Sequence, residues 1–270
     1  MANTEYQLVG NAAELYEQFS VPTGTGPAAR GMLDRIELNA SDRILDAACG
    51  TGIVARLIVE SGSKIASIVG LDLNESMLEV ARKLEPGSSF PITWQQGDLC
   101  ALPFSDHEFD VVICNHGFQF VPKKALALTE IKRVLANDGR FVFTVWSAEA
   151  PINVAIANSI RTHIGEDLAK AVLAPFAYRD LPTIQKLLND AGFQSIAIQE
   201  LTITRRLPAI ETVAMDVIKR SAYAGDVAAA SDTARDAIAR EVYEAMQPYK
   251  EGSEFAEPMS NHLVQVKKVK

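Results

Sequence analysis

The sequence predicts an α/β protein built on a mostly parallel β-sheet that is covered by helices on both faces. From residue 40 onward, short apolar runs rich in β-branched residues alternate with amphipathic helical patterns. Most of these helices have recognisable ends, with capping residues before them and Gly or Pro after them. The chain has 270 residues, 48% of them hydrophobic, which suffices for one large domain, with or without insertions.

Seven segments have the composition and length of strands. The first five alternate with helices, as a parallel sheet requires, and the last two lie in less regular sequence. In chain order, the predicted strands are 43–47, 65–72, 92–96, 109–115, 139–145, 195–204 and 262–269.

The helices of the sheet region are predicted from their caps and apolar faces. Asn74 is a good N-cap for the second helix, and Gly192 closes the last one. Leu128, Ile131 and Leu135 share one face of the third helix. We expect helices over 53–61, over 75–84, from Pro122 to the turn at 137–139, and over 181–191.

The remaining residues predict helical additions to a single domain. Residues 1–39 are expected to form a helical lead-in or lid, with a Pro/Gly break at 21–27. Residues 40–270 are expected to form the sheet domain, with helical insertions at about 148–179 and 206–255. The second insertion has helical periodicity for two helices within 209–250, and we expect both insertions to be lids rather than a second fold.

Composition excludes several classes of function. The net charge of −8 disfavours nucleic acid and anionic membranes as partners, because both require clustered Lys and Arg. No apolar run is long enough to span a bilayer, and the first ten residues lack signal-peptide features, so we expect a cytoplasmic protein. The three cysteines and four histidines have no metal-ligand spacing, so we expect no metal.

The most informative segment is the glycine-rich loop at 46–52, between the first strand and the helix that follows it. Glycines there let the backbone approach a ligand and turn sharply into a helix whose first N–H groups face the same crevice. Residues 50–55 also match the dinucleotide-binding pattern G-x-G-x-x-G/A. The loop alone therefore does not identify its ligand.

Three carboxylates at the ends of successive strands distinguish between a cationic ligand and a dinucleotide. Asp46 precedes the glycines, where it would repel a pyrophosphate but attract a cation. Asp72 ends the second strand, where a carboxylate can accept hydrogen bonds from ribose hydroxyls. Asp98 follows the third strand, within reach of an exocyclic adenine amine. This arrangement favours a cationic nucleoside ligand over a nicotinamide dinucleotide.

Four segments in one order resemble the class I S-adenosylmethionine (SAM) dependent methyltransferases of the type-11, ubiquinone-biosynthesis-like group. The resemblance implies a Rossmann-like, doubly wound sheet of seven strands, mostly parallel with the last strand antiparallel, and helical lid insertions. One departure is Ala48, where the family usually has glycine; we expect it to be tolerated. The segments are LDAACGTG at 45–52, GLDLNESMLEVAR at 70–82, QGDLCALPFSDHEFDVVICN at 96–115 and EIKRVLANDGRFVFTVW at 130–146.

The resemblance also implies a set of SAM-binding residues. The methionine end of SAM is expected near the start of the glycine loop, the ribose at the second strand end, the adenine at the third, and the sulfonium near the fourth. The implied cofactor-binding residues are Asp46, Ala48, Gly50, Gly52, Asp72, Leu73, Met77, Asp98, Leu99 and Asn115. Three alternatives stay open: Asp46 orients loop N–H groups, Asp72 caps a helix, and Met77 is core packing.

The residues on the acceptor side are predicted less specifically. His116 is the candidate base, because it follows the fourth strand where ligands of open sheets collect; the alternative is a histidine that only packs in the pocket wall. Tyr16 and Phe19 of the lead-in, Phe118 after the fourth strand and Trp146 after the fifth are candidate substrate contacts. The alternatives are a simple hydrophobic face for Tyr16 and Phe19, anchoring of the next loop for Phe118, and core packing for Trp146.

We therefore expect a methyltransferase that transfers a methyl group from SAM to an oxygen, nitrogen or activated carbon of a small molecule, with S-adenosylhomocysteine as product. A protein of the same fold that binds SAM without transferring methyl is the main alternative, and an NAD-dependent oxidoreductase is a weaker one. The acceptor and the oligomeric state are not predicted.

Overall fold

The computed structural model describes residues 11–87 and 90–268 and divides them into two compact units. Unit 1 takes in the residues up to Val145, Tyr178–Leu201 and the residues from Asn261 onward. Unit 2 comprises Trp146–Ala177 and Thr202–Ser260. Within the described residues, none of the helices combines the length and the apolar character required to cross a membrane.

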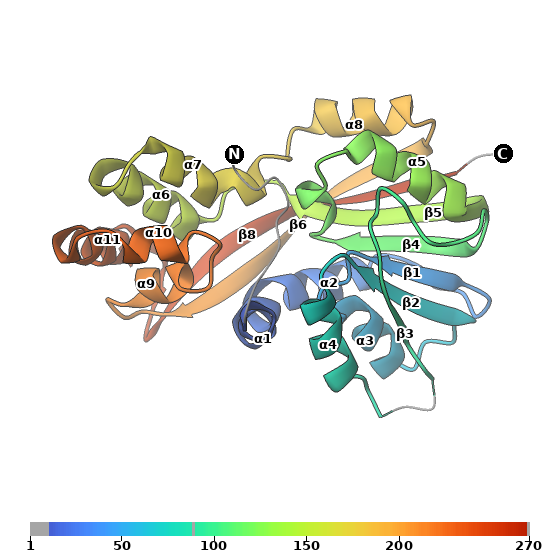
Figure 1. The fold of residues 1–270 in the computed structure, drawn as a ribbon, viewed down its shortest axis with the longest axis horizontal. Helices are drawn as coiled ribbons and strands as arrows, with labels where there is room; N and C mark the ends of the chain where they lie inside the picture. The colour runs from blue at the N-terminus through green and yellow to red at the C-terminus, as the bar shows by residue number, and fades with distance from the viewer. Residues whose placement is uncertain (1–10, 88–89, 269–270) are drawn as a thin grey trace. The chain divides into compact units, whose positions relative to one another are not determined.

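The strands form one mixed sheet in the order β3-β2-β1-β4-β5-β8-β6, with β7 paired to β8 (Figure 1). The first five are parallel. Hydrogen bonds from Lys268 to Gly139 and from Ser147 to Ser260 make β8 antiparallel to β5, as expected for the last strand. The strands are β1 Arg43–Ala47, β2 Ser67–Asp72, β3 Thr93–Gln96, β4 Phe109–Asn115, β5 Leu135–Trp146, β6 Gln194–Pro208, β7 Lys250–Glu251 and β8 Glu254–Lys267.

The helices of unit 1 cover both faces of its sheet (Figure 1). Successive residues of β4 point to opposite layers: Val112 joins the cluster under α5 and α8, whereas Val111 joins the cluster under α2 and α3. Both faces are therefore buried, as a parallel sheet requires. These helices are α2 Gly26–Leu33, α3 Ile53–Glu60, α4 Glu75–Lys83, α5 Lys124–Val134 and α8 Leu181–Asp190.

Unit 2 has a hydrophobic core of its own, built from α6 Pro151–His163, α7 Glu166–Leu173, α9 Val213–Ile218, α10 Ala224–Ala228 and α11 Asp232–Ala245. A fully buried Glu257 pairs with Arg205 and accepts a hydrogen bond from the N–H of Ile152 in the first turn of α6. The two predicted insertions thus pack together into one compact unit, with its own core, rather than as two separate lids.

Several predicted boundaries were wrong. The lead-in is helical through its Pro/Gly break: α1 Ala12–Leu15 continues as a π-helix, η1 Tyr16–Thr25, and then as α2. The Gly26 N–H donates to the Val21 carbonyl, and a Cβ at Gly26 would lie 2.5 Å from that oxygen, so only glycine permits the wide turn. The predicted lead-in residues 1–10 lie outside the described part of the chain.

Other differences concern strand ends. β5 begins at Leu135, directly after α5, so the predicted third helix is shorter and its strand longer. β8 begins at Glu254, eight positions before the predicted start, and its predicted end at 269 lies outside the described residues. Residues 209–250 contain three α-helices rather than two.

Candidate functional site

The glycine loop joins β1 to α3 through three residues in left-handed conformation. Ala48, Gly50 and Gly52 have φ values of 53°, 56° and 79°. Left-handed backbone costs roughly 1–2 kcal/mol for a residue with a Cβ, so Ala48 is strained where the family usually has glycine. Gly117 makes room for it, because a Cβ there would lie 2.5 Å from the Cβ of Ala48. The departure at Ala48 is thus accommodated by a second glycine.

Asp46 lies beneath this loop with 1% of its surface exposed. Its Oδ2 accepts a hydrogen bond of 3.1 Å from the N–H of Ala55, in the first turn of α3. Burial raises the pKa of Asp46 to about 7, and the negative charge of Asp72 adds to the increase. Asp46 therefore orients backbone N–H groups after the loop, one of the two interpretations that the sequence left open.

Asp72 connects the loop to the turn after β2. Its Oδ2 accepts a 2.8 Å hydrogen bond from the Gly50 N–H, and its Oδ1 accepts a 2.9 Å bond from the Asn74 N–H. Burial raises the pKa of this carboxyl, and these N–H groups oppose the increase. Helix α4 is capped by the side chain of Asn74 instead, which accepts from the Ser76 N–H. Asp72 thus lies at the loop as a carboxylate acceptor and is not the N-cap of α4.

The residues expected near adenine lie on unit 1 with different exposures. Leu73 leaves 41% of its surface exposed, which is unusual for leucine and suits a face that receives an apolar ring. Asp98 is exposed and accepts a 2.8 Å bond from the Cys100 N–H, whereas Leu99 is buried. Met77 packs in a small cluster with Ala13, Val80 and Tyr16, which favours the core-packing interpretation of this residue.

Trp94 on β3 was not among the site residues predicted from the sequence. A Cβ at Gly52 would lie 2.2 Å from its Cη2, and a Cβ at Gly70 would lie 2.5 Å from its Cε3. The indole therefore fills the space that both glycines leave, and it holds the end of the loop against β2 and β3. A glycine in the middle of a buried strand, here Gly70, signals such a close approach and could have indicated it.

Thr51 is the second residue that was missed. It is completely buried within the loop, and its Oγ1 has no hydrogen-bond partner within the part of the chain that the structure describes. A buried hydroxyl is normally hydrogen-bonded, so an unpaired one beside a strained loop fits a ligand-binding role. The hydroxyl of Thr51, the acceptor oxygens of Asp72 and the exposed apolar face of Leu73 together fit SAM, which has hydroxyl groups and an apolar ring.

The lead-in is fastened to this loop at several points. The ring of Tyr16 lies over Gly50, where a Cβ would be 3.8 Å from its Cε1, and its hydroxyl bonds Thr25 at 3.1 Å. Glu17 forms an ion pair of 2.8 Å with Arg56 of α3. Phe19 lies in the same π-helix and is half-buried. The structure thus brings Tyr16 to the glycine loop, as the lead-in prediction requires.

Asn115 and His116 follow β4 at the same edge. Asn115 donates to the Thr25 carbonyl at 3.1 Å and accepts from the Thr144 hydroxyl at 2.8 Å, so it also holds the lead-in. His116 is 5% exposed, and its burial lowers its pKa to about 4, although Asn261 and Gln119 oppose this decrease. A buried imidazole with this pKa is a weak base, so the geometry favours a packing role for His116.

Phe118 and Trp146 lie in hydrophobic clusters. Phe118 is completely buried and packs on Phe143, with ring centroids 5.2 Å apart, so its burial does not favour the predicted contact with the acceptor. Trp146 belongs to unit 2, where it packs against Phe176 with centroids 5.9 Å apart. Core packing, the alternative stated for Trp146, describes both residues in the structure.

Comparison with known proteins places these motifs in a family. A family model for a methyltransferase domain matches residues 45–143. A demethylmenaquinone methyltransferase of Lactococcus lactis is 33% identical over 170 residues, which cover 58% of this chain and 68% of the relative. The corresponding enzyme of Lactobacillus johnsonii is 35% identical over 140 residues, 50% of this chain and 57% of the relative. The chain thus spans little more than half the length of the latter.

Solved structures support the fold. A methyltransferase from a Haloferax volcanii complex with the activator Trm112 aligns with a TM-score of 0.61 and 19% identity, and the match covers 96% of each chain. The [4+2]-cyclase SpnF aligns with a TM-score of 0.55 and 19% identity, covering 90% of this chain and 80% of the cyclase. At such identities the likeness concerns the fold alone, and it includes a protein described as a cyclase.

Proposed function

The chain belongs to the class I SAM-dependent methyltransferases of the type-11, ubiquinone-biosynthesis-like group, and on this basis we propose that it methylates a small molecule. The observation that carries the proposal is the glycine loop, with Asp72 bound to the Gly50 N–H at its centre. Bound SAM supplies a methyl group activated by a positively charged sulfur. The residues of the chain bind and orient it and exclude water.

Asp72 is the residue best placed to hold the ribose. It already accepts two backbone N–H groups, and a carboxylate retains further lone pairs for hydroxyl donors. The exposed face of Leu73 adjoins it in sequence and is proposed to support the adenine. The buried hydroxyl of Thr51 is proposed to gain its missing partner from SAM. Asp46 acts indirectly, because it orients the start of α3.

Charge distinguishes this proposal from dinucleotide binding. A carboxyl group with 1% exposure lies directly under the loop, and a second adjoins Gly50. A pyrophosphate would place two negative charges beside these groups, whereas SAM brings a sulfonium and an ammonium. The ionised carboxylate of Asp46 would therefore disfavour NAD, whereas either cofactor could place its ribose hydroxyls on Asp72.

We propose as acceptor an activated ring carbon of a reduced naphthoquinone or a related phenol. The support is that the relatives in Lactococcus lactis and Lactobacillus johnsonii are named demethylmenaquinone methyltransferases. Tyr16 and Phe19 of the lead-in are the proposed contacts, since Tyr16 lies over Gly50. His116 is proposed to support the wall of the site, because its low pKa makes it a poor proton acceptor.

Calorimetric titration with SAM, S-adenosylhomocysteine and NADH tests the cofactor. We expect binding of the first two, and a loss of affinity of at least about 100-fold in Asp72→Ala. Asp110→Ala is the matched control, because Asp110 is a carboxylate of the same sheet that pairs with Arg43 at 2.9 Å; its SAM affinity should stay within about twofold of wild type. Binding of NADH without SAM would overturn the proposal.

Turnover is tested by S-adenosylhomocysteine formation with a panel that contains a reduced demethylnaphthoquinone, a simple phenol and an amine. We expect product with the reduced quinone and none with its oxidised form, because only the reduced ring has a nucleophilic carbon. SAM binding without turnover on the whole panel would instead assign the chain to proteins that use this fold without methyl transfer.

A further inference from the structure

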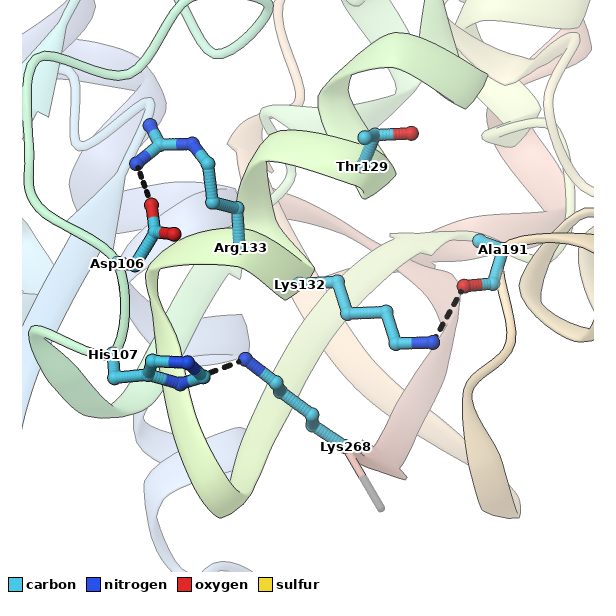
Figure 2. A pocket seen from close by; sticks show the side chains of 7 residues that line it. All are labelled: Asp106, His107, Thr129, Lys132, Arg133, Ala191 and Lys268. Carbon is cyan, nitrogen blue, oxygen red and sulfur yellow. Dashed lines mark hydrogen bonds and ion pairs between the residues drawn. The ribbon is translucent and has the colours of Figure 1, made fainter. Parts of the chain in front are cut away.

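A pocket of about 340 Å³ lies in unit 1 at the sheet edge opposite the glycine loop (Figure 2). It is lined by residues just before β4, by the last turns of α5, by the end of α8 and by Lys268 after β8. A water molecule occupies about 30 Å³ in the liquid, so the pocket has room for a ligand of several heavy atoms. None of the predicted SAM-binding residues contributes to it.

Lys132 of α5 extends its ammonium to the end of α8. Its Nζ donates to the carbonyls of Ala191, at 3.2 Å, and Gly192, at 2.9 Å. A Cβ at Gly192 would lie 2.5 Å from this nitrogen, so the missing side chain leaves the space that the ammonium occupies. The ammonium is thereby held in place by two neutral acceptors and retains one N–H for a further partner.

Lys268 enters the same pocket from the end of β8. It is only 8% exposed, and its Nζ donates to the Leu135 carbonyl and lies 3.1 Å from Nδ1 of His107 (Figure 2). Burial lowers the pKa of this ammonium, and the positive charge of Lys132 lowers it further, whereas the negative charge of Asp106 raises it. Two cationic groups are therefore held near each other in a partly desolvated place.

The carboxylates of Asp106 and Glu130, near the pocket, form ion pairs with Arg133. Arg133 binds Asp106 at 3.0 Å and Glu130 at 2.8 Å, and it also donates to the carbonyls of Phe104 and Leu102. Within residues 11–87 and 90–268, neither Lys132 nor Lys268 forms an ion pair with a carboxylate. Unneutralised like charges held close together cost stability, and such arrangements are typical of sites that take an oppositely charged ligand.

We propose that this pocket binds a small phosphate-bearing anion between the ammonium groups of Lys132 and Lys268. An ammonium is a point charge that suits phosphate oxygens, whereas the planar guanidinium of Arg133 already uses all five of its N–H groups. The site is independent of the proposed methyl transfer, because it lies at the other end of the strands.

Pyrophosphate is the probe for this site. Calorimetry at low ionic strength should show binding to the wild-type chain, and the affinity should fall at least about tenfold in Lys132→Gln and in Lys268→Gln. Lys170→Gln is the matched control, because Lys170 of unit 2 is a lysine 66% exposed at the surface and far along the chain from the pocket. It removes the same charge and should leave the affinity unchanged.

Three results would overturn the proposal. One is a heat of pyrophosphate addition equal to that of sodium chloride at matched ionic strength. Another is equal weakening in Lys170→Gln, which would indicate a nonspecific effect of net charge. The third is binding to phosphatidylglycerol vesicles without binding of free pyrophosphate, which would assign the charge to a membrane surface. Circular dichroism checks that both pocket variants are folded, and Lys268→Gln leaves the bonds of Lys132 to α8 intact.

Discussion

The carboxyl edge of the unit 1 sheet, where β1 and β2 end, and its amino edge, where β4 and β5 begin, carry groups of opposite charge. At the carboxyl edge, Asp46 and Asp72 lie under a strained glycine loop. At the amino edge of β4 and β5, Lys132 and Lys268 line a pocket and are held by backbone carbonyls. In both places the fold buries charged groups and satisfies them mainly through the backbone.

The length of the strands keeps the two proposed binding sites apart. β4 has seven residues, which at about 3.3 Å each place its ends roughly 20 Å apart. That is about twice the distance over which exposed charges interact in physiological salt. Acids at one edge can therefore favour a cationic ligand while lysines at the other favour an anion, without strong interaction between them.

The largest expected effect is at the carboxyl edge, in Gly52→Ala. The new Cβ must enter the ring of Trp94 and adopt a φ of 79°, so the free energy of unfolding should fall by roughly 2–5 kcal/mol. Urea denaturation measures this, and SAM affinity should fall with it. Gly225→Ala is the control, since a Cβ there meets open space.

A second substitution identifies the cause. The double variant Gly52→Ala with Trp94→Leu removes the indole and should recover part of the lost stability, although the left-handed backbone remains strained. If the two changes are simply additive, contact with Trp94 is not what requires glycine at position 52.

The next effect is the pH dependence of stability due to Asp46. Its folded pKa of about 7 exceeds the ordinary value of 3.8, so the folded state binds the proton more tightly and stability falls as pH rises between these values. Asp46→Asn lacks this titration but keeps an acceptor for Ala55. As the pH rises from 5 to 8, the free energy of unfolding of Asp46→Asn should increase by roughly 2–3 kcal/mol relative to that of wild type.

Chemical denaturation at several pH values measures this gain. Parallel stability curves for wild type and Asp46→Asn would show that burial does not raise the pKa of Asp46.

The smallest expected effect is that of a substitution at one edge on the ligand affinity of the other edge. Lys268→Gln should change SAM affinity by less than about twofold, and Asp72→Ala should change pyrophosphate affinity by less than about twofold, because of the separation between the edges. Reciprocal calorimetric titrations of these two variants test it. A tenfold cross-effect would show that the edges are coupled and that the comparison fails.

Much of the sheet between residues 43 and 115 could be predicted from sequence. β1 and β4 have their predicted bounds, and α4 begins after Asn74, because capping, alternation and tertiary packing agree there. Pro22 suggested a break in the lead-in, but the chain there forms a π-helix, in which the N–H of Gly26 donates to the carbonyl of Val21 five residues earlier. Local rules about proline do not contain that information.

The sequence predicts which residues belong to the candidate site better than it predicts how their side chains pack. Asp72 could be assigned because its position after β2 determines which edge it reaches. The burial of Phe118 depends on packing against Phe141 and Phe143 of β5, and the role of Trp94 depends on contacts with Gly52 and Gly70. These partners lie far away in sequence. Such packing arises only when distant segments meet, so a pattern read along one segment does not show it.

The chain has two tryptophans, and each compact unit contains one of them: Trp94 lies in unit 1 and Trp146 in unit 2. The packing of Trp94 against two glycines thus has a spectroscopic consequence. With Trp146 replaced by phenylalanine, fluorescence follows unit 1 alone, and with Trp94 replaced it follows unit 2. Emission from the two single-tryptophan chains during denaturation would report whether the units unfold as one cooperative body or in succession.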